Sequence, residues 1–315
     1  MKEQWMQKTG VVWFVAMICC LLWGSAFPCI KIGYKMFHIA SSDAASQLLF
    51  AGCRFFLAGV LVLLLGTAGH FKVKKKEVPM ILILALFQTV LQYLFFYIGL
   101  AHTTGVKSSI INGSNSFLVI LITSLIFRQE KLTGPKILGC VIGFAGVILI
   151  NLSGTGIDMT FHWNGEFLIL LCTISAAFSS AFIKMFSSKA NPVLLSGWQF
   201  VVGGTVLIIT GKITGGHLRF DGAAPLFLLL YMACISAVAY TLWSLLLKYN
   251  PPSRIAVFGF MNPVFGVMLS ALLLKEKGQA FSLTGLTSLI LVCIGIYIVN
   301  RENPLKEASK DKTFA

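Results

Sequence analysis

The chain has 315 residues, of which 57% are hydrophobic and 11% are charged. Soluble domains carry about 25% charged residues, so this composition excludes an ordinary water-soluble core and favours the lipid bilayer as the solvent of the chain. The formal net charge is +14, but the basic residues lie mostly between apolar runs, as topology signals do. Because no basic pattern interleaved with aromatic residues is present, we expect no nucleic-acid partner.

The cysteine and histidine residues do not form a recognisable ligand set. All eight cysteines fall inside apolar runs, and the five histidines lie in or near the connections between runs. Neither CxxC nor HExxH spacing occurs. We therefore interpret the cysteines as small core residues and expect neither a metal site nor a cofactor.

The first 27 residues combine a basic start with an apolar run. Two interpretations are open for this segment, a cleaved signal peptide and a retained first span. The run is long for a signal peptide and lacks a clear small-x-small cleavage site followed by a polar mature start. We therefore predict a retained first span.

Apolar runs bounded by charged residues, Pro or Gly predict ten membrane spans, since a span needs about 20 apolar residues. The ten predicted spans are 11–31, 46–66, 79–101, 106–127, 134–151, 166–186, 193–213, 224–246, 254–274 and 282–299. Most prolines fall at or just before the start of a span, where a missing N–H costs little. Pro28 and Pro263 lie within spans and are expected to loosen those helices.

The basic residues predict the orientation of the spans. With the N-terminus inside, 17 Lys and Arg residues lie on the cytoplasmic side and 7 on the outer side, and Arg54 lies within a span. This bias favours a cytoplasmic location of both termini. We therefore expect a multi-pass protein of the cell membrane (plasma or inner membrane), with residues 67–78 inside and 152–165 outside.

The two halves of the chain resemble each other. Residues 113–131 align with residues 259–277, which lie 146 positions further on, and residues 54–59 align with residues 199–204. Because five spans is an odd number, the second set must enter the membrane inverted. Transporters use this arrangement to open alternately to either side; duplication kept only for stability is the alternative.

The predicted fold class is an all-α integral membrane protein with ten transmembrane helices in a 5+5 inverted-topology repeat. The predicted parts are a first five-helix repeat at 1–151, a polar connection at 152–165, a second, inverted five-helix repeat at 166–300 and a cytoplasmic tail at 301–315.

Three stretches resemble a known family. They are LLWGSAFPCIKIG (21–33), RFFLAGVLVLLL (54–65) and RQEKLTGPKILGCVIGFAGVILIN (128–151), with their counterparts in the second half. In order and spacing, residues 10–300 are similar to the drug/metabolite transporter superfamily, and within it to the ten-helix EamA-type transporters. The resemblance implies a 5+5 bundle with a central cavity, and often export of amino acids or related metabolites. The halves differ chemically at Arg54, whose counterpart is Gln199.

A polar stripe lies in the fourth predicted span, within the stretch SSIINGSNSF. On a regular helix Ser108, Asn112 and Asn115 fall within about 40° of one another. Such a stripe is costly against lipid, so it should face the bundle interior. Two roles are open for it, hydrogen bonding between helices and a surface that contacts substrate or water.

Other spans supply similar polar or aromatic positions. The candidate substrate-binding residues are Trp23, Arg54, Gln88, Gln92, Ser108, Asn112, Asn115, Trp198, Gln199, Tyr240, Trp243 and Asn262. For the aromatic residues the alternative is packing or the interfacial belt, which Trp198 fits and Trp23 does not. The pattern Gly139-x-x-x-Gly143-x-x-Gly146 predicts close helix packing rather than function.

These features predict a secondary transporter or exporter of small polar metabolites, working by alternating access as a monomer with the lipid bilayer and a small-molecule substrate as its partners. A flippase for lipids or lipid-linked sugars is the alternative. A membrane enzyme is disfavoured because no GxSxG motif, phosphate-binding loop or mid-span carboxylate is present. A channel fits an inverted repeat less well.

The charges within the spans suggest how the substrate is recognised. No Asp, Glu or His lies in the middle of a predicted span, and Glu130 and Glu276 sit at span ends, where we expect solvated ion pairs. Arg54 is the one deep charge and does not titrate usefully. It either attracts a carboxylate or braces neighbouring carbonyl groups. We expect neutral, zwitterionic or anionic substrates and no bound proton.

Overall fold

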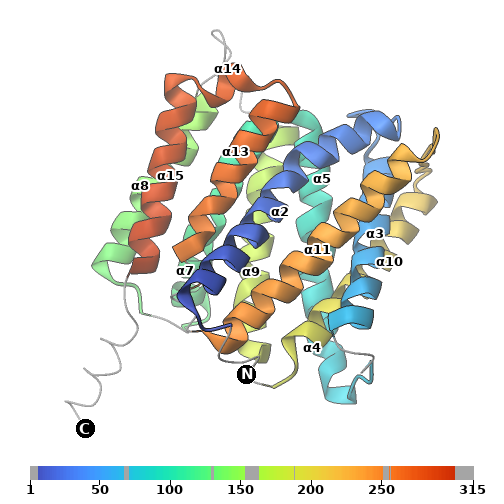
Figure 1. Cartoon of the computed structure of the whole chain (residues 1–315), viewed down its shortest axis with the longest axis horizontal. Coiled ribbons are helices and arrows are strands. Elements are labelled where there is room, and N and C mark those ends of the chain that lie inside the picture. Colours follow the sequence, from blue (N-terminus) through green and yellow to red (C-terminus); the bar gives the residue numbers. More distant parts are fainter. Residues whose placement is uncertain are drawn as a thin grey trace.

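The computed structural model describes residues 6–66, 71–128, 131–152, 163–187, 189–250, 255 and 257–301. These residues form a bundle of helices and contain no strand (Figure 1).

The helices of the first half occupy most of residues 9–152. Their bounds are α2 Thr9–Met36, α3 Ala44–Leu61, η1 Val62–Gly66, η2 Lys75–Glu77, α4 Val78–Leu84, η3 Ala85–Leu91, α5 Gln92–His102, α6 Gly105–Gly113, α7 Asn115–Leu121, η4 Ile122–Ile126 and α8 Gly134–Leu152.

The helices of the second half follow from residue 163 onward. Their bounds are η5 Trp163–Phe167, α9 Leu168–Ser187, α10 Pro192–Ile213, α11 Ala224–Tyr249, η6 Val257–Phe260, α13 Met261–Leu273, α14 Lys277–Ala280 and α15 Leu283–Arg301.

Among the described residues, seven helical segments are long and apolar enough to cross a membrane, and three shorter ones are apolar too. The seven are Thr9–Met36, Ala44–Gly66, Lys75–His102, Gly105–Ile126, Trp163–Phe186, Pro192–Ile213 and Ala224–Trp243; the shorter ones are Gly134–Ile150, Met261–Leu273 and Leu283–Val299. Each predicted span overlaps one of these segments. The expectation of an all-helical, multi-pass membrane protein is therefore confirmed at this level.

The surface and the interior of the bundle have the polarity expected in lipid. Leu65 and Ile213 are 79% and 80% exposed, whereas Arg54 and Gln199 are 2% and 0% exposed. A soluble protein buries its large aliphatic side chains and exposes its charges. In a bilayer, large apolar residues can face the hydrocarbon while polar groups must turn inward.

The helices α3 and α10 pack along each other in opposite directions. Gly52 approaches Ile208, and further along α3 Gly59 approaches Val201, so residue numbers rise on one helix as they fall on the other. A Cβ added at Gly52 would lie 2.6 Å from the backbone N of Ile208. Glycine is required here because two backbones meet with no room for a side chain.

Two further helix pairs, α6 with α13 and α8 with α15, cross in the same antiparallel way. Their close contacts are Gly105 with Ser270, Ser109 with Gly266, Gly113 with Pro263, Gly139 with Val299, Gly143 with Gly295 and Gly146 with Val292. The packing role predicted for Gly139, Gly143 and Gly146 is therefore confirmed.

The other helices pack in a mirrored order. The first span, α2, lies against α11 and α13, while α9, the first span of the second half, lies against α5 and α7. α7 begins at Asn115 and α13 at Met261, which are separated by the 146-residue spacing of the sequence repeat. In Figure 1 the start of α2 and the end of α15 point to the same end of the bundle, and α14 lies at the opposite end, here called the α14 end.

Some local expectations need correction or lie outside the described residues. Five cysteines are buried, but Cys234 is exposed, so not every cysteine is a core residue. α2 continues through Pro28 without a break, and the residues on both sides of this proline are buried. Pro263 lies in the first turn of α13, where the missing backbone N–H would have no partner within the helix. Glu130, most of the connection 152–165 and the tail after 301 lie outside the described residues.

We predict that Gly204→Ala destabilises the protein by about 1–3 kcal/mol. An added Cβ would lie 2.4 Å from the backbone N of Phe56, so α10 would have to move away from α3. Gly10→Ala is the matched control, because nothing lies within 4 Å of its added Cβ and alanine favours a helix. Thermal unfolding in detergent measures both; equal melting temperatures would contradict the close crossing.

Candidate substrate-binding site

Aromatic side chains from several helices meet in the interior of the bundle. The Trp23 ring of α2 lies edge-on to Tyr240 and Trp243 of α11, with centroids 5.6 and 5.1 Å apart. The Phe55 ring of α3 lies 3.8 Å from the Tyr93 ring of α5. The hydroxyls of Tyr93 and Tyr240 are 3.4 Å apart and join the two groups. Together these rings form a continuous aromatic surface, whose polar groups are the tyrosine hydroxyls and the tryptophan N–H groups.

Arg54 lies beside this aromatic surface and is almost fully buried. Its Nε donates to the backbone O of Met232 at 3.2 Å, its Nη1 to the Tyr97 hydroxyl at 3.3 Å and its Nη2 to the Ser236 hydroxyl at 3.1 Å. Its guanidinium carbon also lies 4.9 Å from the centre of the Phe55 ring. All these partners are neutral. The charge is held by dipoles and a π-face, an arrangement with less stabilisation than a carboxylate provides.

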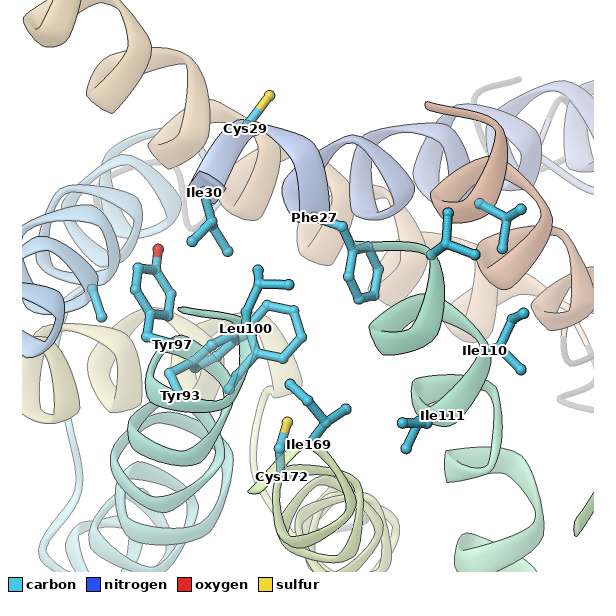
Figure 2. Close-up of a cluster of buried hydrophobic side chains, with 14 of the residues drawn as sticks. Phe27, Cys29, Ile30, Tyr93, Tyr97, Leu100, Ile110, Ile111, Ile169 and Cys172 are labelled. Carbon is cyan, nitrogen blue, oxygen red and sulfur yellow. The ribbon is translucent and has the colours of Figure 1, made fainter. Parts of the chain in front are cut away.

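The surroundings of the tyrosines are apolar. Figure 2 shows Tyr93 and Tyr97 on α5 facing Ile30 of α2, with Phe27 and Leu100 nearby. Water is excluded from such a cluster, and electrostatic interactions are stronger in a medium of low dielectric constant. An anionic group brought next to Arg54 would therefore be held more strongly than at a hydrated surface.

The polar interior extends toward α10 through the side chains of Gln88, Thr89 and Gln199. The Thr89 hydroxyl donates to Oε1 of Gln199, the repeat counterpart of Arg54. Nε2 of Gln199 and Oε1 of Gln88 are buried and have no hydrogen-bond partner among the described residues. Buried amide groups without partners are uncommon in proteins. They leave donor and acceptor capacity inside the bundle.

The stretch SSIINGSNSF is an interrupted helix rather than the regular one that the stripe assumed. α6 ends at Gly113, and Ser114 links it to α7, which begins at Asn115. Ser109 faces Gly266 of α13 at the antiparallel crossing, as Gly105 and Gly113 do along the same face. Ser109 therefore serves close helix packing, and both roles considered for the stripe of Ser108, Asn112 and Asn115 stay predictions.

The predicted residues of this stretch are buried to different degrees. Ser108 is fully buried, whereas Asn112 and Asn115 are half-buried. The hydroxyl of Ser108 and the amide oxygens of Asn115 and Asn262 have no hydrogen-bond partner in the part of the chain that the structure describes. Asn262 is the second residue of α13 and follows the change from the 3₁₀ helix η6 to the α-helix; its convergence with Asn115 stays a prediction.

The structure brings some predicted residues together and separates another. Trp23, Arg54, Tyr240 and Trp243 belong to one connected set of contacts through Phe55, Tyr93 and Tyr97. Trp198 instead donates to the backbone O of Phe71 at 3.1 Å and packs in a separate hydrophobic cluster. This placement fits the interfacial alternative for Trp198. Gln92 is half-buried at the start of α5.

Sequence reasoning missed Tyr93 and Tyr97 as members of this site. Tyr93 and Tyr97 are four residues apart, as Gln88 and Gln92 are, and the two pairs are offset by five residues. The helical period of the third span therefore contained the signal. Ser236, four residues before Tyr240 on α11, also joins this site through its contact with Arg54.

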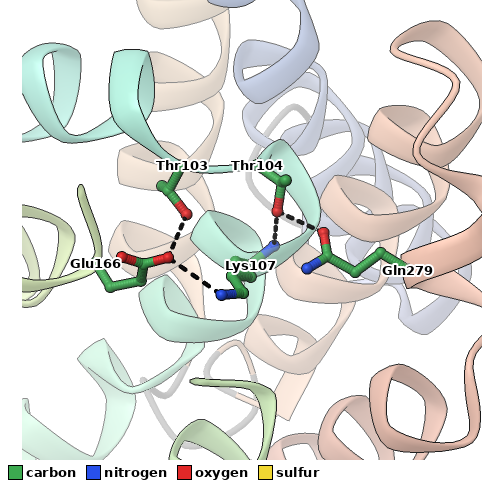
Figure 3. Close-up of polar contacts among 5 residues, drawn as sticks. All are labelled: Thr103, Thr104, Lys107, Glu166 and Gln279. Carbon is green, nitrogen blue, oxygen red and sulfur yellow. Dashed lines mark hydrogen bonds and ion pairs between the residues drawn. The ribbon is translucent and has the colours of Figure 1, made fainter. Parts of the chain in front are cut away.

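A second polar cluster, which we call the α14-end cluster, consists of Thr103, Thr104, Lys107, Glu166, Glu276 and Gln279 (Figure 3 shows all but Glu276). Glu166, 2% exposed, accepts from the Thr103 hydroxyl at 3.0 Å and from Nζ of Lys107 at 3.2 Å. The Thr104 hydroxyl donates to Oε1 of Gln279.

The expected solvated pairing of Glu276 at a span end is wrong. Its carboxylate accepts from the backbone N–H groups of Gly105 at 3.2 Å and Val106 at 2.9 Å. A helix N-terminus attracts a carboxylate because its first N–H groups have no partner within the helix. Sequence reasoning also missed the buried pair of Glu166 and Lys107, since nothing in the order of residues brings position 166 to position 107.

Comparison with known proteins finds similarity over most of the chain. Residues 9–152 and 163–301 each match the model of the EamA-like transporter family. An uncharacterized transporter of Archaeoglobus fulgidus is 28% identical over 92% of this chain and 99% of its own length. A probable amino-acid metabolite efflux pump of Escherichia coli is 27% identical over 93% of this chain and 94% of its own.

A solved crystal structure also matches the whole bundle. Its TM-score is 0.65 with 16% sequence identity, and the match covers 92% of this chain and 96% of the other. At this identity the likeness concerns the fold alone.

We predict that Ser236→Ala costs about 1.5–3 kcal/mol of stability, because it removes a hydroxyl that accepts from the buried Arg54 guanidinium. Ser109→Ala is the matched control, since the Ser109 hydroxyl is buried without a partner among the described residues, and it should change stability by less than about 0.5 kcal/mol. Chemical or thermal unfolding in detergent compares the two. Equal effects would show that the Arg54 contact adds nothing.

Proposed function

The chain belongs to the EamA-like transporter family, and from this premise we propose that it exports small polar metabolites by alternating access. The family is one of transporters, so the chain is not an enzyme. Relatives from Escherichia coli and Salmonella typhimurium carry the name of probable amino-acid metabolite efflux pump. Their names support amino acids or related compounds as the substrate class of this protein.

The observation that carries the proposal is the mixed polar and aromatic interior around Arg54. Small-molecule sites are mostly apolar and aromatic, with a few placed polar groups that fix the orientation of the ligand. Arg54, Tyr97 and Ser236 supply such polar groups, and Trp23 and Tyr240 supply the aromatic faces. These groups come from α2, α3, α5 and α11, so a movement between helices would change their arrangement.

The proposed architecture is the 5+5 inverted-topology repeat. Its support is the mirrored packing of the two halves: α2 lies against α11 and α13, and α9 lies against α5 and α7. The antiparallel crossings of α3 with α10, α6 with α13 and α8 with α15 pair repeat-related helices. Two copies of one fold in opposite orientations can exchange roles, which is the structural basis of alternating access.

The proposed orientation places both termini in the cytoplasm and the α14 end outside the cell membrane. The excess of basic residues near the terminal end supports it.

We predict the labelling of single cysteines introduced into a cysteine-free variant of the protein. In intact cells, a cysteine that replaces Lys75, which is exposed in η2, should not react with a membrane-impermeant thiol reagent. A cysteine at the exposed Ala40, between α2 and α3, should react. Labelling at 75 and not at 40 would reverse the orientation.

We further propose that the substrate carries a carboxylate and that Arg54 binds it. A buried charge whose described partners are all neutral is stabilised by an anion more than by another dipole, and a guanidinium binds a carboxylate in a bidentate manner. The Arg54 guanidinium has five N–H donors, and the described contacts use three of them. Since Arg54 does not titrate, transport would need no bound proton.

We predict that counterflow of an amino acid in proteoliposomes proceeds without a pH gradient and is insensitive to a protonophore. The amide analogue, which lacks the carboxylate, should bind about 10- to 100-fold more weakly. Arg54→Gln should remove this preference, and Arg54→Lys should retain a reduced one because Lys keeps the charge without the planar fork.

A preference for the carboxylate that survives in folded Arg54→Gln would assign Arg54 to bracing instead. Strict dependence on an imposed proton gradient would contradict proton-independent transport. In that case the buried carboxylate of Glu166 is the first residue to test, because Glu276 is committed to the α6 backbone.

A further inference from the structure

The α14-end cluster joins the two halves of the chain at one end of the bundle. Glu166 of η5 binds Thr103 and Lys107 of the first half. Gln279 of α14 accepts from Thr104, the residue directly before α6. The contacts therefore run from the connection between α5 and α6 to two separate segments of the second half (Figure 3).

The cluster also completes the N-terminus of α6. The N–H groups of Gly105 and Val106 donate to Glu276, and the N–H of Lys107 donates to the Thr104 hydroxyl at 3.1 Å. Two of these three N–H groups therefore donate to a residue of the other half of the chain. If the halves separate here, α6 loses a carboxylate that is placed favourably against the positive end of its dipole.

The burial of the ion pair makes the cluster sensitive to its geometry. The side chains of Lys107 and Glu166 are 13% and 2% exposed. Such a pair is far less screened by salt than a surface pair, and removing one partner leaves the other as an uncompensated charge. That charge gains hydration when the end opens, so loss of the pair favours the open arrangement.

We propose that the α14-end cluster is a latch that holds this end of the bundle closed, and that its release sets how often the interior opens there. The proposal rests on the alternating access proposed above, in which the halves move relative to each other. A movement that separates η5 and residues 276–279 from Thr103–Lys107 would open the α14 end and break all of these contacts.

A second side-chain contact between the halves, from His38 to Asp221, provides a control. Nε2 of His38 and Oδ2 of Asp221 are 2.7 Å apart, but their side chains are 54% and 70% exposed. Exposed pairs contribute little, because water and salt screen them. Asp221→Asn therefore removes one carboxylate charge that joins the halves, as Glu166→Gln does, but without leaving a buried charge behind.

The test measures access to the interior instead of transport. In the full chain without other cysteines, a reporter cysteine replaces Tyr240, which is half-buried beside Trp23 and Tyr93 in the interior. Right-side-out and inside-out vesicles are treated with a membrane-impermeant maleimide, which shows the side from which the reporter is reached. The parent is compared with Glu166→Gln, Thr103→Val, Asp221→Asn and the charge swap Lys107→Glu with Glu166→Lys.

We expect Glu166→Gln to raise the labelling rate from the α14 end about tenfold and to leave labelling from the other end equal or slower. Thr103→Val, which keeps the ion pair and the shape of the side chain, should give about a threefold rise. The charge swap should return the rate toward that of the parent, and Asp221→Asn should change it by less than about twofold.

The latch is contradicted if Glu166→Gln and Thr103→Val are both folded and labelled at the rate of the parent, or if Asp221→Asn raises labelling as much as Glu166→Gln. Should Glu166→Gln fail to fold, Thr103→Val decides alone. The labelling is measured without substrate, so the latch can be detected even if the protein transports none of the substrates offered. If the protein transports its substrate but labelling is the same in all variants, only the latch is contradicted and the proposed function stands.

Discussion

In the hydrocarbon core of a bilayer no water is available to a polar group, and this constraint decides which residues of the chain face inward. Within the helices that make up most of the described residues, backbone groups bond to one another. The deep polar side chains, Arg54 and Gln199 among them, point away from the apolar surface that carries Leu65 and Ile213. Because few polar groups are present and all must be enclosed, they gather in the interior, where a polar substrate could meet them.

Close approach of helix backbones is the second requirement, because lipid provides no hydrophobic force between helices. Glycine and serine at the three antiparallel crossings, such as Gly59 near Val201 and Gly266 near Ser109, let repeat-related helices touch. These crossings link the two halves along their length.

The two polar clusters have different physical characters. Arg54 carries a charge that its described neighbours stabilise only through dipoles and a π-face, so the interior has an electrostatic capacity that a ligand can use. Lys107 and Glu166 neutralise each other, and the Glu276 carboxylate accepts from the backbone N–H groups at the start of α6, so each charge of the α14-end cluster already has a partner. The first arrangement suits binding of a charged group, and the second suits closure between the halves.

The sequence by itself determined the membrane class, the approximate span positions and the family, because composition, apolar run length and the 146-residue repeat are properties of residue order. It also pointed to Arg54, Trp23 and Tyr240, since polar or aromatic residues deep in a span are costly against lipid. Only the tertiary structure shows that Arg54 contacts Ser236 and that Glu166 contacts Lys107. Only the tertiary structure shows that Trp198 lies apart from Arg54, Trp23 and Tyr240. Those contacts cross between helices far apart in the chain, so they depend on helix packing and rotation, which local periodicity does not specify.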